Sequence, residues 1–124
     1  MARRATRESG AAAAASLAKA LRAAAIAEGR RAEDVVVLDL RGQTLVTDYF
    51  VIATGMSRVQ IRAIIDAIAD GLADVRPRGV REGDEAAGWV LLDYGDIVVH
   101  VFAPEARAFY RLERLWADAP AVTR

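Results

Sequence analysis

The sequence predicts an α/β fold, a single domain in which helices pack against one mixed five-stranded sheet. Its 124 residues match the size of one ordinary domain, and 54% of them are hydrophobic. Short β-branched runs, typical of buried strands, alternate with stretches of helical periodicity. The expected order is helix, strand, strand, helix, strand, strand, strand, helix, which one helix-covered sheet satisfies. The domain is expected at residues 10–120, between tails at 1–9 and 121–124.

The N-terminal part is predicted to be a basic tail followed by a helix. Residues 1–9 show no hydrophobic pattern, so we expect a flexible tail there. Residues 10–28 are rich in alanine and end before Gly29, a common helix stop. Three apolar residues fall on one face of this helix: Leu17, Leu21 and Ala25. Because Lys19 and Arg22 interrupt the segment, we expect a packing helix of a cytoplasmic protein, and neither a signal peptide nor a membrane span.

Two strands and a second helix are expected next. Residues 35–38 and 49–53 form β-branched and aromatic runs suited to buried strands, with a turn at Arg41–Gly42 between them. Ser57 and Gln60 have the spacing of a capping box, which predicts a helix start. The predicted helix carries one apolar stripe: Ile61, Ile64, Ile65, Ile68 and Leu72.

The C-terminal half is predicted to contain an edge strand, a hairpin and a final helix. Residues 78–81 fit a short edge strand, and a polar loop follows at 82–88. Residues 89–92 and 97–102 are apolar runs on either side of a turn, which describes an antiparallel hairpin. Pro104 begins the last helix. Three large apolar residues are expected to share one face of that helix: Phe109, Leu112 and Trp116.

Strand alternation divides the hairpin into two faces. One is aliphatic and is expected to be core: Val90, Leu92, Ile97, Val99 and Val101. The other mixes aromatic, aliphatic and titratable groups: Trp89, Leu91, Asp93, Val98, His100 and Phe102. Such a mixture suits the centre of a protein interface, and a covering helix explains it equally well. The pattern leaves both interpretations open.

The composition argues against catalysis and against a metal site. The chain has no cysteine and one histidine, so neither a thiolate site nor a multi-histidine site can form. Ser57 stands at a strand-to-helix junction as in nucleotidyltransferases, but the paired aspartates that hold their metal ions are missing. Asp93, Asp96 and His100 lie close in sequence, yet aspartates are common turn residues. We therefore predict no enzyme, no catalytic residue, no metal and no cofactor.

The net charge is zero, but its distribution is uneven. Residues 1–33 carry seven basic and three acidic groups, and residues 34–124 carry ten and fourteen, a net of +4 and −4. A domain that binds nucleic acid through its phosphates usually has a basic face. The mildly acidic folded part therefore favours a basic protein as partner. RNA binding through the basic N-terminal segment is the alternative.

Several rare residues recur in an order found in a known family. The hairpin reads WVLLDYGDIVVHVF over residues 89–102, and Arg107, Phe109-Tyr110 and LERLW at 112–116 follow it. Three further segments stand upstream: DVVVLDL at 34–40, TDYFVIATG at 47–55 and REG at 81–83. Together they resemble the motifs of the ribosomal silencing factor family, also called RsfS or Iojap. The resemblance covers roughly residues 15–120 and leaves out the N-terminal residues 1–14.

The resemblance implies a fold related in shape to nucleotidyltransferases, without their catalytic aspartates. It implies binding to protein L-fourteen of the large ribosomal subunit, on the surface that later bridges to the small subunit. Subunit joining is then blocked, and translation falls when nutrients run short. Homodimers occur in the family, and dimerisation is implied here in that sense. Carried over to this chain, the expected partner-binding residues are Trp89, Leu91, Tyr94, Asp96, His100, Phe102, Arg107 and Tyr110.

Overall fold

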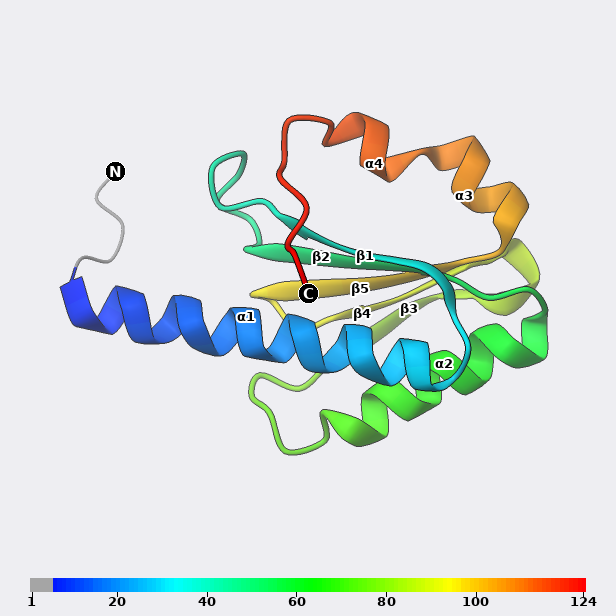
Figure 1. Ribbon diagram of the computed structural model, residues 1–124. Coiled ribbons are helices and arrows are strands. Elements are labelled where there is room, and N and C mark those ends of the chain that lie inside the picture. The colour runs from blue at the N-terminus through cyan, green and yellow to red at the C-terminus, as the bar shows by residue number, and fades with distance from the viewer. Residues whose placement is uncertain (1–5) are drawn as a thin grey trace.

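The computed structural model describes residues 6–124 as a three-layer α/β domain (Figure 1). Its helices and strands, in chain order, are α1 (Thr6–Gly29), β1 (Glu33–Asp39), β2 (Tyr49–Thr54), α2 (Arg58–Gly71), β3 (Val80–Asp84), the 3-10 turn η1 (Glu85–Ala87), β4 (Trp89–Asp93), β5 (Ile97–Phe102), α3 (Pro104–Tyr110) and α4 (Leu112–Leu115). The five strands form one mixed sheet packed by helices on both sides. The predicted fold class is therefore confirmed.

The hairpin β4–β5 lies at the centre of the sheet. The strand order is β1-β2-β5-β4-β3, so β5 has neighbours on both sides. It pairs in parallel with β2 and antiparallel with β4, while β1–β2 and β3–β4 are antiparallel. Ile52 and Leu91 both lie opposite His100 in these pairings. Whatever covers the two faces of β5 therefore decides which hairpin residues reach the surface.

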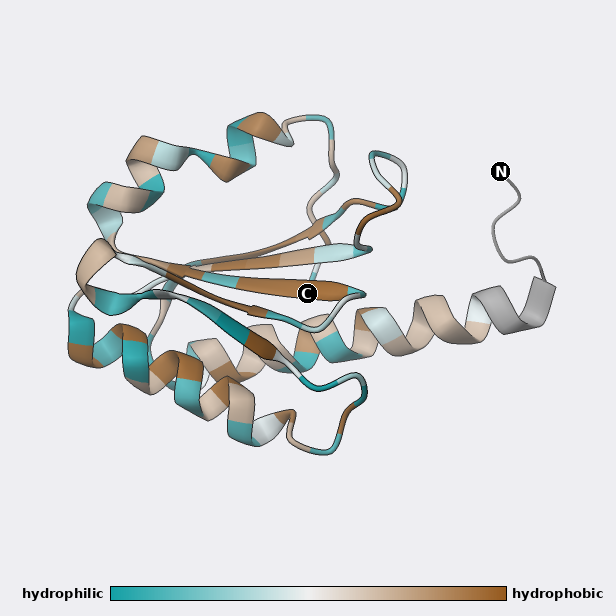
Figure 2. Ribbon diagram, turned by 180° about the vertical axis from the view of Figure 1, so that it is seen from behind, coloured by the Kyte–Doolittle hydropathy of each residue, from teal (hydrophilic) through white to brown (hydrophobic). Residues whose placement is uncertain are grey.

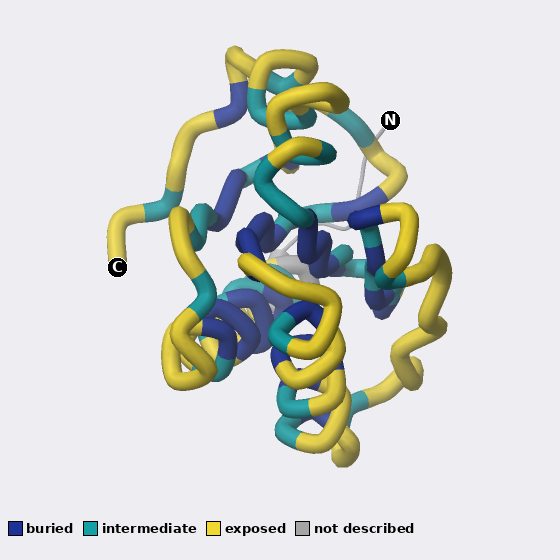
Figure 3. The backbone as a smooth tube through the Cα atoms, turned by 90° about the vertical axis from the view of Figure 1, so that its right-hand side faces the viewer, coloured by how far each residue is buried: buried dark blue, intermediate teal, exposed yellow. Residues whose placement is uncertain are grey.

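Helices α1 and α2 cover one face of the sheet, which we call the closed face (Figure 1). The hairpin residues predicted to be core are at most 3% exposed, and the predicted apolar stripe of α2 is at most 2% exposed. Figure 3 shows both helices buried toward the sheet and exposed on the outside. The predicted cap at Ser57 is confirmed, because the Gln60 backbone N–H donates to Ser57 Oγ (3.0 Å). The reciprocal bond differs from a capping box, since Gln60 Oε1 accepts from the N–H of Met56 (2.6 Å), one residue before the cap.

The buried face of α1 differs from the prediction. Leu17 and Leu21 are half-buried and Ala25 is exposed, so these residues do not form the inner stripe. The residues that do are alanines with no exposed surface: Ala20, Ala23, Ala24 and Ala27. Small side chains let a helix approach its neighbours closely, which leaves the bulkier leucines at the margins. The stretch Gly10–Gly29 is long and apolar enough to cross a membrane by length and composition, and here its alanine stripe is core.

Helices α3 and α4 and the last residues cover the other face, which we call the aromatic face. The single helix predicted from Pro104 is wrong in one respect: Arg111 adopts a left-handed conformation (φ 50°) and ends α3 one residue before α4 begins. The C-terminal residues lie along β1, where the Val122 N–H donates to Val37 O (2.8 Å) and the Asp39 N–H donates to Pro120 O (2.9 Å). The chain end thus covers the β1 edge of the sheet.

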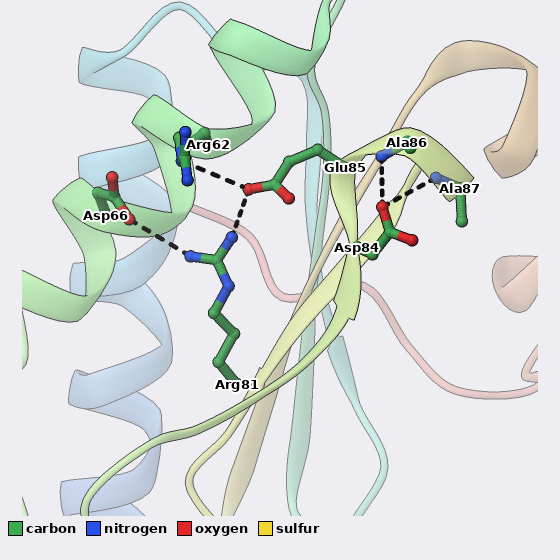
Figure 4. Close-up of polar contacts among 7 residues, drawn as sticks. All are labelled: Arg62, Asp66, Arg81, Asp84, Glu85, Ala86 and Ala87. Atoms are coloured by element: carbon green, nitrogen blue, oxygen red, sulfur yellow. Dashed lines mark hydrogen bonds and ion pairs between the residues drawn. The ribbon is translucent and has the colours of Figure 1, made fainter.

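Strand β3 forms the opposite edge and is exposed along its whole length. The predicted strand (78–81) and loop (82–88) differ from the structure, in which the strand continues through residue 84. Gly83 (φ 88°) allows this, because at that position a Cβ would meet Trp89 O at 2.2 Å. Figure 2 shows it largely hydrophilic beside the hydrophobic inner strands. Arg81 binds Glu85 and Asp66, and Arg62 lies 3.7 Å from the same Glu85 carboxylate (Figure 4). Charge contacts therefore hold β3 against α2.

Candidate protein interface

The register of the sheet brings four of the expected partner-binding residues onto the aromatic face. Trp89 lies opposite Phe102, and Leu91 lies opposite His100. Directly opposed residues in a sheet point to the same side, so all four side chains share one face. Phe102 has no exposed surface, because α3 and α4 pack over it, whereas Trp89 and Leu91 are half-buried. The four residues are thus neighbours with unequal access to a partner.

Six rings form a continuous row across this face. The ring centroids are 5.1 Å apart for Phe109–Tyr110, 4.5 Å for Tyr110–Trp89, 5.9 Å for Trp89–His100, 4.5 Å for His100–Phe50 and 6.0 Å for Phe50–Trp116. All of these distances lie in the range of favourable aromatic pairs. Exposure falls along the row, from 79% at Phe109 and 48% at Tyr110 to 5% at His100. One end of the row is therefore open to solvent and its middle is buried.

His100 is a buried, neutral histidine. Burial lowers its pKa to about 4, and the nearby Asp93 carboxylate opposes this shift only in part. Its Nδ1 accepts a hydrogen bond from Trp89 Nε1–H (3.1 Å), so the neutral ring carries its proton on Nε2. In the part of the chain whose side chains are described, residues 10–124, Nε2 has no hydrogen-bond partner. His100 thus orients the Trp89 indole and leaves one buried donor unpaired.

Helices α3 and α4 cover only part of the aromatic face. The core that they form with the sheet is centred on β1, β2 and β5: Leu38, Leu40, Ile52, Phe102 and Ala119. On the β4 side, an apolar surface remains accessible, and we call it the open surface: Trp89, Leu91, Phe109 and Tyr110. Contiguous exposed aromatic groups around a half-buried tryptophan have the composition of an interaction hot spot.

Arg107 lies behind the open surface and binds inward. Its side chain is 12% exposed. Its Nη1 donates to Asp34 O (2.7 Å) and Thr54 Oγ1 (2.8 Å), and its Nε donates to Glu113 (3.0 Å). One guanidinium therefore ties α3 to α4, β1 and β2. The structure places Arg107 as a brace that positions the helix carrying Tyr110, so its contact with a partner would be indirect.

Tyr94 and Asp96, also expected at the interface, lie apart from the open surface. Tyr94 is 2% exposed and packs in the core of the closed face, where its ring fills the space beside Gly79. Asp96 accepts hydrogen bonds from Ser16 Oγ (2.7 Å) and Lys19 Nζ (2.9 Å) of α1. Both side chains join the hairpin turn to the closed-face layer. These two motif residues therefore stabilise the fold.

Phe109 was predicted to share one helix face with Leu112 and Trp116, and this prediction is wrong. Phe109 is instead the most exposed residue of the open surface. Because Arg111 interrupts the helix, Leu112 and Trp116 pack on the sheet while Phe109 stays outside. The sequence holds no glycine or proline at residue 111 that would signal this break. Phe50, the ring between His100 and Trp116, was assigned to a buried strand without a role in the row.

The groups considered for chemistry are occupied by structural contacts. Ser57 caps α2, and Asp93 accepts a hydrogen bond from the Gly95 N–H (2.8 Å) in the hairpin turn. A cleft of about 440 Å³ beside Arg107 is lined by Glu33, Asp34, Arg111 and Arg114 among others. Among the described side chains of residues 10–124, no three His, Cys, Asp or Glu groups are placed to hold a metal ion. The site's assembled features are those of a binding surface.

Comparison with known protein families gives a match over nearly the whole domain. Residues 13–124 match the family described as ribosomal silencing factor during starvation. A ribosomal silencing factor of Bacillus subtilis is 49% identical over 100 residues, which cover 79% of this chain and 84% of the relative. The chloroplastic protein Iojap of Arabidopsis thaliana is 41% identical over 105 residues, covering 84% of this chain and 44% of the relative.

Two solved structures share the fold. A Chromobacterium violaceum protein aligns with a TM-score of 0.76 at 32% identity, covering 82% of this chain and 85% of the other. A Bacillus halodurans protein aligns with a TM-score of 0.70 at 38% identity, covering 87% and 96%. The sequence and structural similarities thus both extend over the sheet and its helices, and the N-terminal residues 1–12 lie outside the family match.

Proposed function

Because this chain belongs to the ribosomal silencing factor family, we propose that it binds protein L-fourteen of the large ribosomal subunit and blocks joining of the small subunit. The family places the chain in the regulation of translation by association with ribosomes. We further propose that repression is strongest when nutrients are limiting and that the protein acts in the cytoplasm. The mechanism requires no catalysis, since occupancy of a shared surface is sufficient.

The open surface is the single observation that carries this proposal. Trp89, Leu91, Phe109 and Tyr110 present apolar and aromatic area on a folded domain that has a complete core elsewhere. Large amphipathic rings in a rigid setting lose little conformational entropy on binding, which is why they dominate interface energetics. His100 and Arg107 hold the Trp89 and Tyr110 side of this surface in place before a partner arrives. A preorganised surface of this kind suits docking on another protein.

Steric exclusion sets the expected dose dependence. A domain bound on the face that the small subunit must approach competes with it directly, without altering either subunit. The fraction of silenced large subunits then follows the concentration of the protein relative to its dissociation constant. A rise in expression would therefore lower the number of active ribosomes until the large subunits are saturated, and dilution would restore them.

The direct test mixes purified protein with isolated large and small subunits and sediments the mixture on a sucrose gradient. We expect the protein to travel with the large subunit and the peak of joined ribosomes to shrink as protein is added. The matched control is Trp89→Ala, which removes the central ring of the open surface and should restore joining; urea unfolding checks that the variant still folds, because Trp89 also donates to His100. Joined ribosomes at full yield, with the protein at the top of the gradient, would refute the proposal.

The same gradient experiment also tests the alternative, which is RNA binding through the basic N-terminal segment. A truncated protein that begins at residue 13 retains the part matched by the family. We expect it to bind the large subunit as the full chain does. If truncation abolishes binding while Trp89→Ala leaves it unchanged, the N-terminal segment carries the function and the protein is better described as an RNA-binding assembly factor.

A further inference from the structure

The β3–β4 end of the sheet is the least covered part of the aromatic face. All five residues of β3 are exposed, including Val80 at 58%. The core formed under α3 and α4 includes no residue of β3. The opposite edge, at β1, is paired with the C-terminal residues 120–122. The two edges are therefore unequal, and the exposed face at β3–β4 is continuous with the open surface through Trp89 and Leu91.

The register at this end pairs one carboxylate with one apolar residue at each step. Val80 lies opposite Asp93, Glu82 opposite Leu91 and Asp84 opposite Trp89. Opposed residues share a face, with Cβ atoms about 5 Å apart, so each carboxylate lies beside an apolar residue of the neighbouring strand. We call these six residues the acidic checkerboard: Val80, Glu82, Asp84, Trp89, Leu91 and Asp93.

The three carboxylates of the acidic checkerboard have no cation to balance them. Among the side chains that the structure describes, residues 10–124, no Lys or Arg lies within ion-pair distance of Glu82, Asp84 or Asp93. Asp84 and Asp93 accept hydrogen bonds from backbone N–H groups, and these bonds do not neutralise the carboxylate charge. Arg81, the cation on the same strand, binds Glu85 and Asp66 on the α2 side (Figure 4). Three like charges therefore stay uncompensated beside exposed apolar groups.

A second polar feature lies next to the same residues. His100, the cross-strand neighbour of Leu91, is 5% exposed, and its Nε2 donor has no acceptor in the described structure. An unpaired buried donor is costly, so few such groups occur in a folded protein. It lies one strand away from the Glu82–Leu91 pair. The unpaired donor and the unbalanced carboxylates thus adjoin the same apolar residue.

We propose that the acidic checkerboard selects a basic protein surface, whose Arg or Lys side chains lie between the carboxylates while its apolar groups contact Leu91 and Val80. The proposal rests on the ribosome-binding function above and adds the chemistry by which the partner is recognised. Charge complementarity decides between occupants, because three carboxylates attract a cationic protein surface and repel the phosphates of RNA. These charges speed association and reject acidic partners, while the open surface supplies the apolar contact.

The test compares two double variants of the full chain with equal changes in net charge. Glu82→Gln with Asp93→Asn neutralises the acidic checkerboard and keeps the Asp93 oxygen that accepts the Gly95 N–H. Asp84 is left intact because it caps η1. The control, Asp70→Asn with Asp118→Asn, neutralises two exposed carboxylates elsewhere. Binding to purified large subunits is measured at about 50 mM and 300 mM KCl, with urea unfolding to check that both variants fold.

We expect the checkerboard variant to bind about five- to tenfold more weakly at the lower salt concentration and to approach the wild type at the higher one. The control variant should match the wild type at both. Equal binding of the two variants at low salt would overturn this inference while leaving the proposed function intact. If the wild type itself fails to bind, the proposed function and this inference both fall. If the wild type still binds ribosomal RNA from which the ribosomal proteins have been removed, the partner is RNA and the inference is overturned.

Discussion

The two faces of the sheet use neighbouring residues of the same strands for different purposes. On the closed face, α1 and α2 bury aliphatic side chains until no exposed surface remains at Val90, Val99 or Val101. On the aromatic face, α3 and α4 stop short of β4, and rings of decreasing exposure run from Phe109 to His100. The closed face is fully covered by other residues of the chain, whereas the aromatic face is covered only in part.

The difference shows how one small domain divides folding from recognition. Aliphatic side chains pack densely against one another and stabilise the fold without any partner, so they form the closed face. Aromatic rings with a polar edge tolerate partial exposure and keep strong contacts ready for a partner, so they suit the aromatic face. Substitutions on the two faces should accordingly separate stability from binding.

Leu92→Ala, on the closed face, should have the largest effect on stability. Leu92 is 3% exposed, and its truncation leaves a cavity under α2. We expect a loss of about 3 kcal/mol in the free energy of unfolding, measured by urea denaturation. The folded fraction should still bind large subunits with the affinity of the wild type. A binding defect that exceeds the loss of folded protein would show that the two faces are coupled.

Trp89→Ala should have the largest effect on binding. Its indole is half-buried and adjoins both Tyr110 and His100, so it has the setting of an interface anchor. We expect the free energy of binding to large subunits to fall by at least about 2 kcal/mol, measured as a dissociation constant from sedimentation. Trp89→Phe, which keeps a ring, serves as the control and should lose less. Unchanged affinity in a folded Trp89→Ala protein would remove Trp89 from the interface.

His100, a buried group of the aromatic face, should make the free energy of unfolding depend on pH. Its pKa is about 4 in the folded protein against 6.5 for an ordinary histidine, so the unfolded chain binds a proton first as pH falls. The stability contributed by the neutral ring is complete above pH 6.5 and is lost as pH falls from there toward 4. Between pH 7.5 and 5 we expect a loss of about 2 kcal/mol in urea unfolding.

The control for this pH dependence is His100→Phe, which keeps an aromatic ring in the row and removes the titrating group. Its free energy of unfolding should stay nearly constant over the same pH range, even if its value at pH 7.5 is lower than that of the wild type. An equal pH dependence in both proteins would assign the effect to carboxylates elsewhere and would contradict the buried, neutral state of His100.

The elements of the fold were largely predictable from local patterns. Strand alternation identified the core face of the hairpin, and the spacing of Ser57 and Gln60 located the start of α2. The alanine stripe of α1 was missed because alanine carries little periodic signal in a segment where eleven of nineteen residues (10–28) are alanine. The break at Arg111 was missed because residue 111 is neither the glycine nor the asparagine that usually signals a left-handed helix end.

The candidate site was less predictable, because exposure depends on how far a covering helix extends. Alternation placed Trp89, Leu91 and His100 on one face, yet it is the packing around each residue that leaves His100 buried among Phe50, Trp89 and Phe102, and leaves Phe109 exposed. Motif resemblance included Tyr94 and Asp96, which serve the packing of the hairpin turn against the closed-face layer. A motif records every residue that a family needs, and the fold is needed as much as the interface.

Leu91→Ala is the smallest expected change and the sharpest comparison with Leu92→Ala. The two leucines are consecutive in β4 and point to opposite faces, so the substitutions are chemically identical. Because Leu91 is already half-exposed, we expect unfolding to change by only about 1 kcal/mol, while binding to large subunits weakens about fivefold. Urea unfolding and sedimentation of the same two samples measure both quantities. If Leu91→Ala destabilises the fold as much as Leu92→Ala, the aromatic face is core throughout and the open surface is no interface.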